Sequence, residues 1–512
     1  MFMRKLQKQL NRLADKSVTN SFLKEIKPTE VKNSEYVFLF NQVFSKFTEK
    51  LYILVSYELS KRGIASCFLY NKQLLGPYYP KLDVNGYEIS NSLTAERRGR
   101  IKSVHEMPLS FEWTVDIDHN CIAAEGINFF PFIRSTLRKK QKRYNVFYKD
   151  EDIKELVQSC DLLLKYFLLL KEYAQKYQKK IRLVGYEAVY IPNGILRMLC
   201  DRLSQDRDIE FIELRRGYMY YFGQHHHRAS YISNSNLTKT KMETGLQVSK
   251  QELAEFDGKD VGLDRLMQPV SNALAKKIDG TTSSDQKKVI RTMEEFKANG
   301  RNVFVLFAHV FYDTPVYDES NAFNGMCEWI LQTMEHFKGK EDLLLIKPHP
   351  GELIKDQPKR TPNETLKSFL SDTKLSENII LLERELFTVK ELSQFISCGL
   401  IWRSSVAMEL TFLKIPCIIA GTPPYTALSL NYAENREQYF QMVGHAHTLK
   451  VTDEQKIEAA KYLYLLENKH VNINCIAYNR SLKKFFWDKK TLKRYLDEGN
   501  REIESVVDNM LT

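Results

Sequence analysis

The segment LLLIKPHPGE at residues 343–352 decides the fold. Its first four residues are apolar and consecutive, which is typical of a short strand buried on both faces. Pro348 ends such a strand, because proline has no N–H to donate to a neighbouring strand. The segment therefore delivers Lys347, His349 and Glu352 at the carboxyl end of a buried strand.

Ligands of open α/β sheets bind at the carboxyl ends of the strands. A lysine and an imidazole placed there suit a phosphate-bearing ligand. The alternative is a polar turn that only follows a core strand. Other polar residues at neighbouring strand ends would favour the ligand site over the turn.

The composition indicates a globular protein with at least two domains. The chain has 512 residues, and a domain typically contains about 100–200. Its hydrophobic content of 43% and charged content of 27% are ordinary for a soluble protein. The net charge of +11 favours acidic partners such as anionic lipid, nucleic acid or phosphorylated substrates.

The residues disfavour several other classes of protein. None of the eight cysteines forms a CxxC pair, which argues against a disulfide framework or zinc site and fits a reducing cytoplasm. No run approaches the ~20 apolar residues of a membrane span. The motifs GxxxxGK[ST], GxGxxG and GxSxG do not occur, which disfavours P-loop ATPases and dinucleotide oxidoreductases. The three histidines at 225–227 would point in alternate directions on an extended chain, so we expect no metal site.

Alternating strand and helix patterns predict two α/β domains. In the first, strands at 36–40 and 65–70 flank a helix at 47–62, which forms a βαβ unit with parallel strands. Further strands are expected at 180–185 and 209–214. The strands expected in the second domain are 302–307, 343–346, 379–382, 397–402 and 415–420.

These patterns divide the chain into four segments. The expected segments are an N-terminal basic helical arm at 1–32, an N-terminal Rossmann-like acceptor domain at 33–285, a C-terminal Rossmann-like donor domain at 286–455 and C-terminal helices at 456–512. A linker is expected near 275–298, where threonine and serine are frequent. The basic arm either packs on the protein or rests on an anionic membrane. The basic run at 134–143 is expected to be a solvated helical face, with an acceptor- or lipid-binding patch as the alternative.

A second polar turn follows another predicted strand of the later half. Ser404 and Ser405 stand between a strand and a helix, where serine is a preferred N-cap and the free backbone N–H groups bind anions. Glu409 lies one turn further on the same helix face, and an acid near a phosphate site commonly binds ribose. Together with Lys347 and His349, these residues describe a nucleotide pocket. The alternative is an ordinary serine cap with an exposed glutamate.

These motifs resemble those of the capsule polysaccharide biosynthesis family. The resemblance is carried by FAHVFYD at 307–313, Trp329-Ile330, KPHPGE at 347–352, RSSVAME at 403–409 and GTPPY at 421–425, with GIN at 126–128 upstream. That family comprises bacterial glycosyltransferases of the GT-B fold. The resemblance implies an α/β protein with two Rossmann-like domains facing across a cleft, to which we add helical N- and C-terminal extensions. The HP and paired-serine motifs are also similar to those of bacterial sialyltransferases and teichoic-acid glycerophosphotransferases.

The resemblance also implies roles for individual residues. The donor-binding residues would be Lys347, His349, Arg403, Ser404, Ser405 and Glu409. The lysine, the histidine and the serines would contact phosphate, and the glutamate would bind ribose. His349 would also stabilise the charge that develops on the leaving nucleotide. Members of the family often carry a basic or Thr-Asn start where this chain has Ala308-His309, so the resemblance assigns no role to His309.

The acceptor hydroxyl needs a base, or a donor phosphate oxygen acting as one. Glu187, at a predicted strand end of the first domain, and Asp313, on the first loop of the second, are both candidates. Stabilisation of the leaving group by a helix dipole and side chains would make a metal unnecessary. We therefore expect no metal and no cofactor, with the nucleotide-sugar as co-substrate.

The function that the resemblance implies is sugar transfer from a nucleotide-activated donor to a growing capsule or other surface polysaccharide. Two alternatives stay open: a CDP-linked polyol phosphotransferase that uses the same pocket, and a non-catalytic polysaccharide assembly or export protein. The expected partners are the nucleotide-sugar, a polysaccharide or lipid-linked glycan acceptor and the anionic inner membrane, but not nucleic acid. The expected location is the cytoplasm, with peripheral contact at the inner face of the plasma membrane.

Overall fold

The computed structural model of the chain describes most of its residues. The described residues are 34–41, 46–68, 111–186, 188–204, 208–216, 228–233, 248–257, 261–262, 264–267, 284–312, 320–352, 363–383, 386–468, 471–479 and 484–511. The predicted arm at 1–32 and the three histidines at 225–227 lie outside these ranges.

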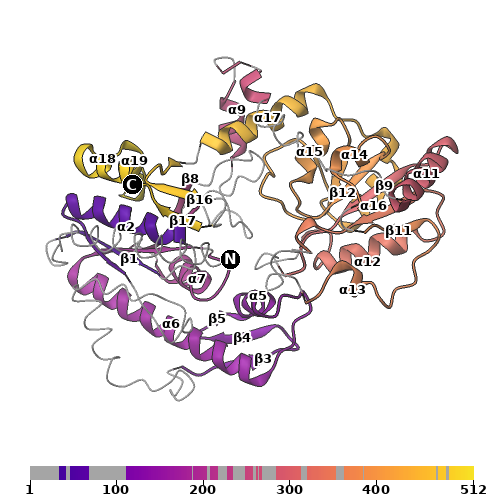
Figure 1. Cartoon of the computed structure of the whole chain (residues 1–512). Coiled ribbons are helices and arrows are strands. Elements are labelled where there is room, and N and C mark those ends of the chain that lie inside the picture. Colours follow the sequence, from indigo (N-terminus) through magenta and orange to yellow (C-terminus); the bar gives the residue numbers. More distant parts are fainter. Residues whose placement is uncertain are drawn as a thin grey trace, which may run out of the picture.

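Two Rossmann-like α/β domains lie side by side (Figure 1), and each is built on a six-stranded sheet. The first sheet has the order β15-β8-β7-β6-β1-β2. Its strands are β1 (Tyr36–Phe40), β2 (Ala65–Phe68), β6 (Lys180–Gly185), β7 (Ile209–Arg216), β8 (Arg228–Ser233) and β15 (Val471–Asn472). Strands β2, β1, β6 and β7 pair in parallel, which confirms the predicted βαβ unit, whereas β8 and β15 are antiparallel to their neighbours.

Helices cover both faces of the first sheet because alternate residues of its strands point in opposite directions. The helices that precede or follow these strands are α2 (Lys46–Lys61), α5 (Phe130–Gln141), α6 (Asp150–Tyr177) and α7 (Asn193–Leu203). Val37 and Leu39 share a core with α6 and α7, whereas Phe38 and Phe40 share a core with α2. Gly63 has a φ of +68° just beyond α2, as expected for a glycine that ends a helix.

A small antiparallel sheet precedes α5 in a region for which the sequence predicts no strand. It contains β3 (Thr114–Asp116), β4 (Cys121–Ala124) and β5 (Ile127–Asn128). The turn between β4 and β5 has positive φ at Glu125 (51°) and Gly126 (70°), a hairpin conformation that favours glycine. Asn128 Oδ1 accepts hydrogen bonds from the backbone N–H groups of Ile122 and Phe130. The GIN motif therefore shapes the entry to α5.

The C-terminal segment returns to the first domain. It contains β16 (Ile476–Asn479), β17 (Lys484–Trp487), α18 (Lys489–Glu498) and α19 (Arg501–Leu511). Ile503 and Val506 of α19 are fully buried in the same core as Phe38 and Leu51. Figure 1 shows α18 and α19 beside α2, so the last helices complete the domain that the first strands begin.

The second sheet is entirely parallel, with the order β11-β10-β9-β12-β13-β14. Its strands are β9 (Val303–Phe307), β10 (Leu343–Lys347), β11 (Ile379–Leu381), β12 (Cys398–Ile401), β13 (Cys417–Ile419) and β14 (Asn431–Tyr432). In chain order this is 3-2-1-4-5-6, the arrangement of a Rossmann sheet. The four apolar residues at 343–346 are fully buried, which confirms the strand predicted from them.

The helices of the second domain form one layer on each face of this sheet. They are α9 (Lys250–Glu255), α11 (Ser284–Ala298), α12 (Met326–Phe337), α13 (Leu366–Phe369), α14 (Val389–Leu392), α15 (Val406–Phe412), α16 (Arg436–Gly444) and α17 (Asp453–Asn468), with 3-10 turns η4 (Pro350–Glu352) and η6 (Ala446–Thr448). Leu344 and Ile346 share a core with α12 and α16. Leu343 and Leu345 share a core with α15 and α17 on the opposite face.

Residues upstream of the second sheet pack with it. The sequence predicts a linker near 275–298, but residues 284–298 form α11, whose Met293 is fully buried in the core of the second domain. Val248 and Leu253, at α9, belong to the same core. The reason is that these segments carry an apolar stripe, which a helix buries against the sheet.

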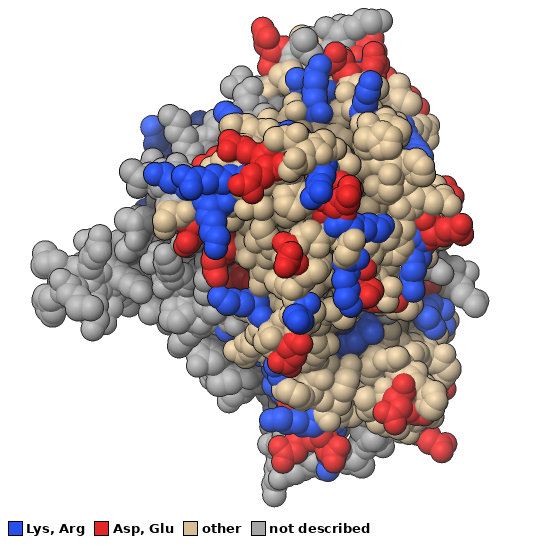
Figure 2. Space-filling model, turned by 90° about the vertical axis from the view of Figure 1, so that its right-hand side faces the viewer, with Lys and Arg blue, Asp and Glu red and all other residues tan. Residues whose placement is uncertain are grey.

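No described helix is both long enough and apolar enough to cross a membrane. Figure 2 shows the outer side of the second domain, where lysine and arginine side chains alternate with aspartate and glutamate. The net charge of +11 is therefore not gathered into a single positive patch on this face.

Candidate functional site

Three loops leave the second sheet next to one another. Phe307 of β9 pairs with Lys347 of β10 on one side and with Ile401 of β12 on the other, so the three strands end at the same level. The chain turns to β10 and β11 on one side of β9 and to β12 on the other. This reversal is the topological switch point, where open α/β sheets bind ligands.

Two imidazoles meet at this edge. His309 follows β9 and His349 follows β10, and their ring centroids lie 5.5 Å apart at an interplanar angle of 35°. Both side chains are half-buried. The structure therefore places His309, to which the sequence assigns no role, beside the predicted site residue. The doubly wound strand order would have indicated this neighbour, because it puts the first strand between the second and the fourth.

Hydrogen bonds within the loops define which nitrogen of each neutral imidazole carries the hydrogen. The backbone N–H of Gly351 donates to His349 Nδ1 at 2.9 Å, so the neutral ring carries its hydrogen on Nε2. A Cβ at Gly351 would lie 2.9 Å from that nitrogen, so glycine permits the approach. His309 Nδ1 lies 3.3 Å from the carbonyl oxygen of Val310, to which it can only donate. Thus His349 presents a donor at Nε2 and His309 an acceptor.

The paired serines do not cap α15 as the sequence predicts. Ser405 is the N-cap residue, but its side chain makes no capping hydrogen bond. The Oγ of Ser404 instead accepts from the N–H of Val406 at 3.3 Å. The physical reason is that Ser405 already has helical dihedral angles (φ −61°, ψ −9°), whereas a capping side chain needs an extended backbone.

The GTPPY loop fixes the serine loop from one side. The hydroxyl of Tyr425, which is 1% exposed, donates to the carbonyl oxygen of Ser404 at 2.5 Å. A Cβ at Gly421 would collide with the carbonyl oxygen of Trp402, so only glycine allows the two loops to pack this closely. These two motif residues therefore have supporting roles.

Trp329, another motif residue, supports the serine loop from the core of the domain by packing on Trp402, which precedes that loop. Its ring stacks on Trp402 with centroids 5.6 Å apart, and its Nε1 donates to the hydroxyl of Tyr439 at 2.9 Å. Burial raises the pKa of Tyr439. Glu352 has a similar internal role, since it is 4% exposed and its Oε1 accepts from the N–H of Leu366 at 3.0 Å.

The remaining predicted residues occupy different places. Lys347 ends β10 and is 6% exposed, whereas Arg403 and Glu409 are half-buried after β12 and in α15. Glu187 and Asp313, the two candidate bases, lie outside the described residues. The structure thus brings Lys347 and His349 to the same sheet edge as the serine loop. Two strand spacings of about 4.8 Å each separate β10, which they follow, from β12, which the serines follow.

Polar side chains of the first domain bond to Tyr186 and Ala188, which follow β6. Asn193 Nδ2 donates to the carbonyl oxygen of Tyr186 at 2.6 Å, and Asn41 Nδ2 donates to Asn193 Oδ1 at 3.1 Å. The N–H of Ala188 donates to Glu213, which is fully buried. These contacts lie at the switch point of the first sheet, between β1 and β6.

The carboxyl edges of the two sheets approach each other around Lys139 of α5. Its Nζ lies 5.2 Å from the ring centroid of Tyr190, which follows β6, and 5.5 Å from that of Tyr312, which follows β9. The neighbouring Arg138 is only 5% exposed and lies over the ring of Tyr144. The prediction of a solvated basic face at 134–143 is therefore wrong for Arg138, because the ring of Tyr144 covers it.

The part of the chain that the structure describes contains no group of three or more histidine, cysteine, aspartate or glutamate side chains that could hold a metal ion. Cys200, Cys398 and Cys417 are buried thiols, and burial raises the pKa of Cys417 to about 12. Such thiols stay protonated at neutral pH and act as small core residues.

Comparisons with known proteins place the chain only loosely. No family model and no curated protein sequence matches it. Among solved structures, KpsC β-Kdo 2,7-transferase of Thermosulfurimonas dismutans shares 11% identity over 69% of this chain and 91% of its own, with a TM-score of 0.28. UDP-GlcNAc 2-epimerase of Neisseria meningitidis shares 11% over 84% and 98%, with a TM-score of 0.22. The apo structure of OtsA shares 10% over 86% and 97%, with a TM-score of 0.28. At these scores the likeness is one of general chain path and assigns no activity.

Proposed function

We propose that this protein is a glycosyltransferase that moves a sugar from a nucleotide-activated donor to a growing capsule or other surface polysaccharide. The observation that carries the proposal is that two imidazoles in contact and a serine loop follow neighbouring strands at the switch point of the second sheet. Neutral donors and a lysine at such an edge suit the phosphates of a nucleotide. The motif resemblance supports the same site residue by residue.

The donor would lie along the three loop ends. His349 Nε2 is oriented as a donor by the N–H of Gly351, so it can bind an oxygen of the leaving diphosphate. Ser405 keeps its hydroxyl out of the helix cap and can bind a second phosphate oxygen. Lys347 and Arg403 would add positive charge, and Glu409 would bind the ribose. Hydrogen bonds that strengthen as charge develops on the leaving group lower the barrier.

In the reaction, the acceptor hydroxyl oxygen forms a bond to the anomeric carbon while the bond from that carbon to the donor phosphate breaks. The hydroxyl proton passes to a base, and the nucleotide departs with the electron pair. Glu187 and Asp313 are candidates for the base, and His309, whose Nε2 is an acceptor in the neutral ring, is a third. No metal or cofactor is needed for these steps.

We place the acceptor between the two facing carboxyl edges, where Lys139 lies between Tyr190 and Tyr312. The rings can stack on sugar faces, and the ammonium suits an acidic glycan. With a net charge of +11, the protein would work in the cytoplasm and touch the anionic inner membrane peripherally.

The proposal is tested by incubating the purified protein with CMP-, UDP-, GDP- and CDP-linked sugars and an extract of surface glycan. We expect nucleotide release and sugar transfer with one donor class, and loss of both in His349→Ala. Phosphate in the product would instead support a CDP-linked polyol phosphotransferase. No binding of any donor, with unchanged cellular glycan in the His349→Ala strain, would support a non-catalytic assembly or export protein.

A further inference from the structure

One segment of the first domain is hydrogen-bonded to the second domain close to the candidate site. The N–H of Asn363 donates to the carbonyl oxygen of Lys142 at 2.9 Å, and its side-chain amide donates to the carbonyl oxygen of Gln141 at 2.8 Å. We call the contact between residues 141–145 and 363–364 the interdomain latch. It joins the end of α5 to the segment that leads into α13.

Glu364 makes the strongest bonds of the interdomain latch. Its Oε2 accepts from the backbone N–H groups of Tyr144 at 2.6 Å and Asn145 at 2.9 Å, and its Oε1 accepts from the side-chain amide of Asn145 at 3.0 Å. Glu364 is only 8% exposed. Hydrogen bonds to an ionised acceptor are stronger than neutral ones, and removing the carboxylate leaves buried donors unpaired.

Tyr144 adds a packing contact that reaches the loop after β9. Its ring meets Phe311 edge-on with centroids 6.1 Å apart and packs against the core of the second domain. Phe311 lies two residues after His309. On the side of the first domain, Arg138 lies 4.0 Å from the Tyr144 centroid and its Nε donates to the Tyr144 carbonyl oxygen at 3.2 Å. The ring is therefore fixed to α5 while it touches the site loop.

The loop after β10 reaches the interdomain latch by another route. The carbonyl oxygen of His349 accepts from the N–H of Glu352 at 3.1 Å. The carboxylate of Glu352 in turn accepts from the N–H of Leu366 at 3.0 Å. Leu366 lies two residues after Glu364. Both histidine loops are thus connected to the same contact through described hydrogen bonds and ring contacts.

We propose that Glu364 is a positioning residue, which sets the distance and angle between the first domain and the two imidazoles of the second. Loss of its carboxylate would release residues 144–145 and let the domains move apart. The consequence for catalysis rests on the proposed function, whereas the consequence for domain geometry does not. An acceptor that is displaced by about 1 Å can lose about 10²-fold in rate.

The geometric test compares wild type with Glu364→Ala and Glu364→Gln in the full chain. Glu383→Gln is the matched control, because Glu383 lies in the same domain and its side chain is 67% exposed in an ion pair with Lys367. We expect amide exchange at residues 144 and 145 to rise roughly tenfold in Glu364→Ala. The radius of gyration from solution scattering should also rise, with Glu364→Gln between the two. Unchanged exchange or an unchanged radius would overturn the proposal.

A second variant approaches the contact from the other domain. Asn145→Ala removes one donor to Glu364 without touching the carboxylate, so its effect combined with Glu364→Ala should not exceed that of Glu364→Ala alone. Additive effects would contradict a shared contact. If the Glu364 variants fold poorly, Asn145→Ala is measured alone by exchange and scattering, and values equal to those of wild type would overturn the proposal.

The kinetic test uses the donor that wild type turns over in the panel above. In Asn145→Ala and Glu364→Gln we expect kcat to fall while the KM for the donor stays within about threefold, because the donor loops belong to the second domain. An unchanged kcat in a variant with altered geometry would overturn the positioning role. A wild type that turns over no donor would overturn the proposed function, and exchange and scattering would then decide the role of Glu364 by themselves.

Discussion

The two domains have the same kind of sheet, but their switch points differ. In the first domain, polar side chains bond across the switch point, since Asn41 after β1 donates to Asn193, which donates to Tyr186 after β6. In the second domain, His309 and Ser404 bond through their side chains within their own loops. His309 is bonded to its neighbour Val310, and Ser404 to Val406. At the edge of the first sheet, amide side chains bond to one another and to the backbone. At the edge of the second sheet, local hydrogen bonds orient the polar side chains.

This difference teaches how one fold can serve two purposes. Bonds across a switch point connect two strands and stabilise the domain. Bonds within a loop orient a ring or hydroxyl without joining the strands, which suits a group that must meet a ligand. The polar residues of the first edge should therefore affect stability, and those of the second should affect binding and turnover.

The largest effect is expected at His349. His349→Ala removes the donor that we assign to the leaving phosphate, so turnover should fall about 10²–10³-fold, as for other donors to a developing charge. The melting temperature should stay close to that of wild type. Steady-state kinetics and calorimetry measure the two. His447→Ala, which removes an exposed histidine of the same domain, is the control. A large fall in melting temperature would show that the polar residues of the second edge stabilise the fold, as those of the first edge are expected to do.

The opposite result is expected at the first edge. Asn193 is 6% exposed, and Asn193→Ala breaks its bonds to Asn41 and Tyr186, so the free energy of unfolding should fall by about 2 kcal/mol. Nucleotide affinity should change by less than about twofold, because the donor loops lie in the other domain. Urea unfolding and titration calorimetry measure these quantities. Loss of nucleotide affinity with normal stability would mean that the nucleotide binds at the edge of the first sheet, and would contradict the proposed site.

A smaller effect should separate a supporting residue from a binding one. Tyr425→Phe removes the hydroxyl that donates to the Ser404 carbonyl oxygen. The serine loop would lose about 1 kcal/mol of support, so donor affinity should fall roughly fivefold. Comparing nucleotide dissociation constants of the variant and wild type checks this. An unchanged constant would mean that the serine loop does not contact the donor.

The smallest effect concerns a histidine that packs rather than binds. Burial, with a contribution from Lys340, lowers the pKa of His336 to about 4. A histidine whose pKa is lowered in the folded state favours folding above its unfolded value of about 6.5, and this contribution is lost as the pH falls toward 4. After allowance for its partial exposure, we expect about 1 kcal/mol.

His336→Phe should flatten that pH dependence, because the phenyl ring keeps the stacking on Phe440, whose centroid lies 4.4 Å away, but does not titrate. Melting temperatures between pH 7 and pH 4 measure it. The same slope in both proteins would show that another group is responsible. His336 packs on Phe440, whereas His309 and His349 lie at the sheet edge where we place the donor.

Local pattern predicted much of the fold. The apolar run at 343–346 and its neighbours predict the buried parallel strands of the second domain, because burial on both faces requires continuous apolar residues. The end of β10 likewise predicts where Lys347 and His349 lie. In contrast, the contact between His309 and His349 depends on which strands are neighbours, and no local pattern contains that information.

Other features were missed for related reasons. The absence of a serine cap on α15 depends on the helical dihedral angles of Ser405, and the bond that Ser404 Oγ accepts from Val406 depends on the same local backbone. The motif residues Trp329 and Glu352 resemble site residues in the sequence, but the structure uses them inside the domain. Glu364 lies outside every motif, and its role as an acceptor for Tyr144 depends on a contact between residues 220 positions apart.

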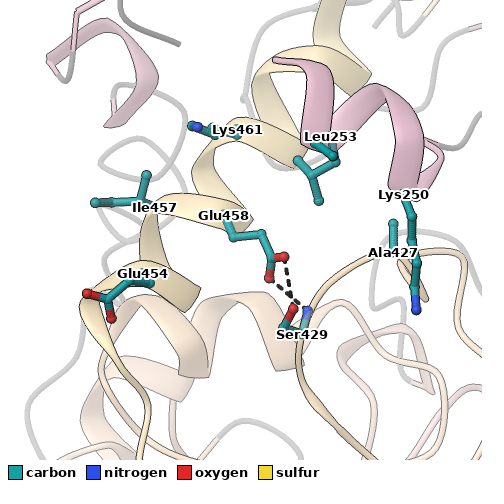
Figure 3. Close-up of a pocket in the computed structure, with 9 residues that line it drawn as sticks. Lys250, Leu253, Ala427, Ser429, Glu454, Ile457, Glu458 and Lys461 are labelled. Carbon is teal, nitrogen blue, oxygen red and sulfur yellow. Dashed lines mark hydrogen bonds between the residues drawn. The ribbon is translucent and has the colours of Figure 1, made fainter. Parts of the chain in front are cut away.

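The return of the C-terminal segment has a consequence for biosynthesis. The face of α2 that contains Leu51 is buried by Ile503 and Val506, residues that the ribosome makes some 450 positions later. The second domain has its whole sheet by residue 468, together with α17, whose Glu458 accepts hydrogen bonds from Ser429 of the same domain (Figure 3). It can therefore fold while translation continues. The nascent first domain therefore keeps an apolar surface exposed until α19 emerges, and a chaperone has that interval in which to bind it.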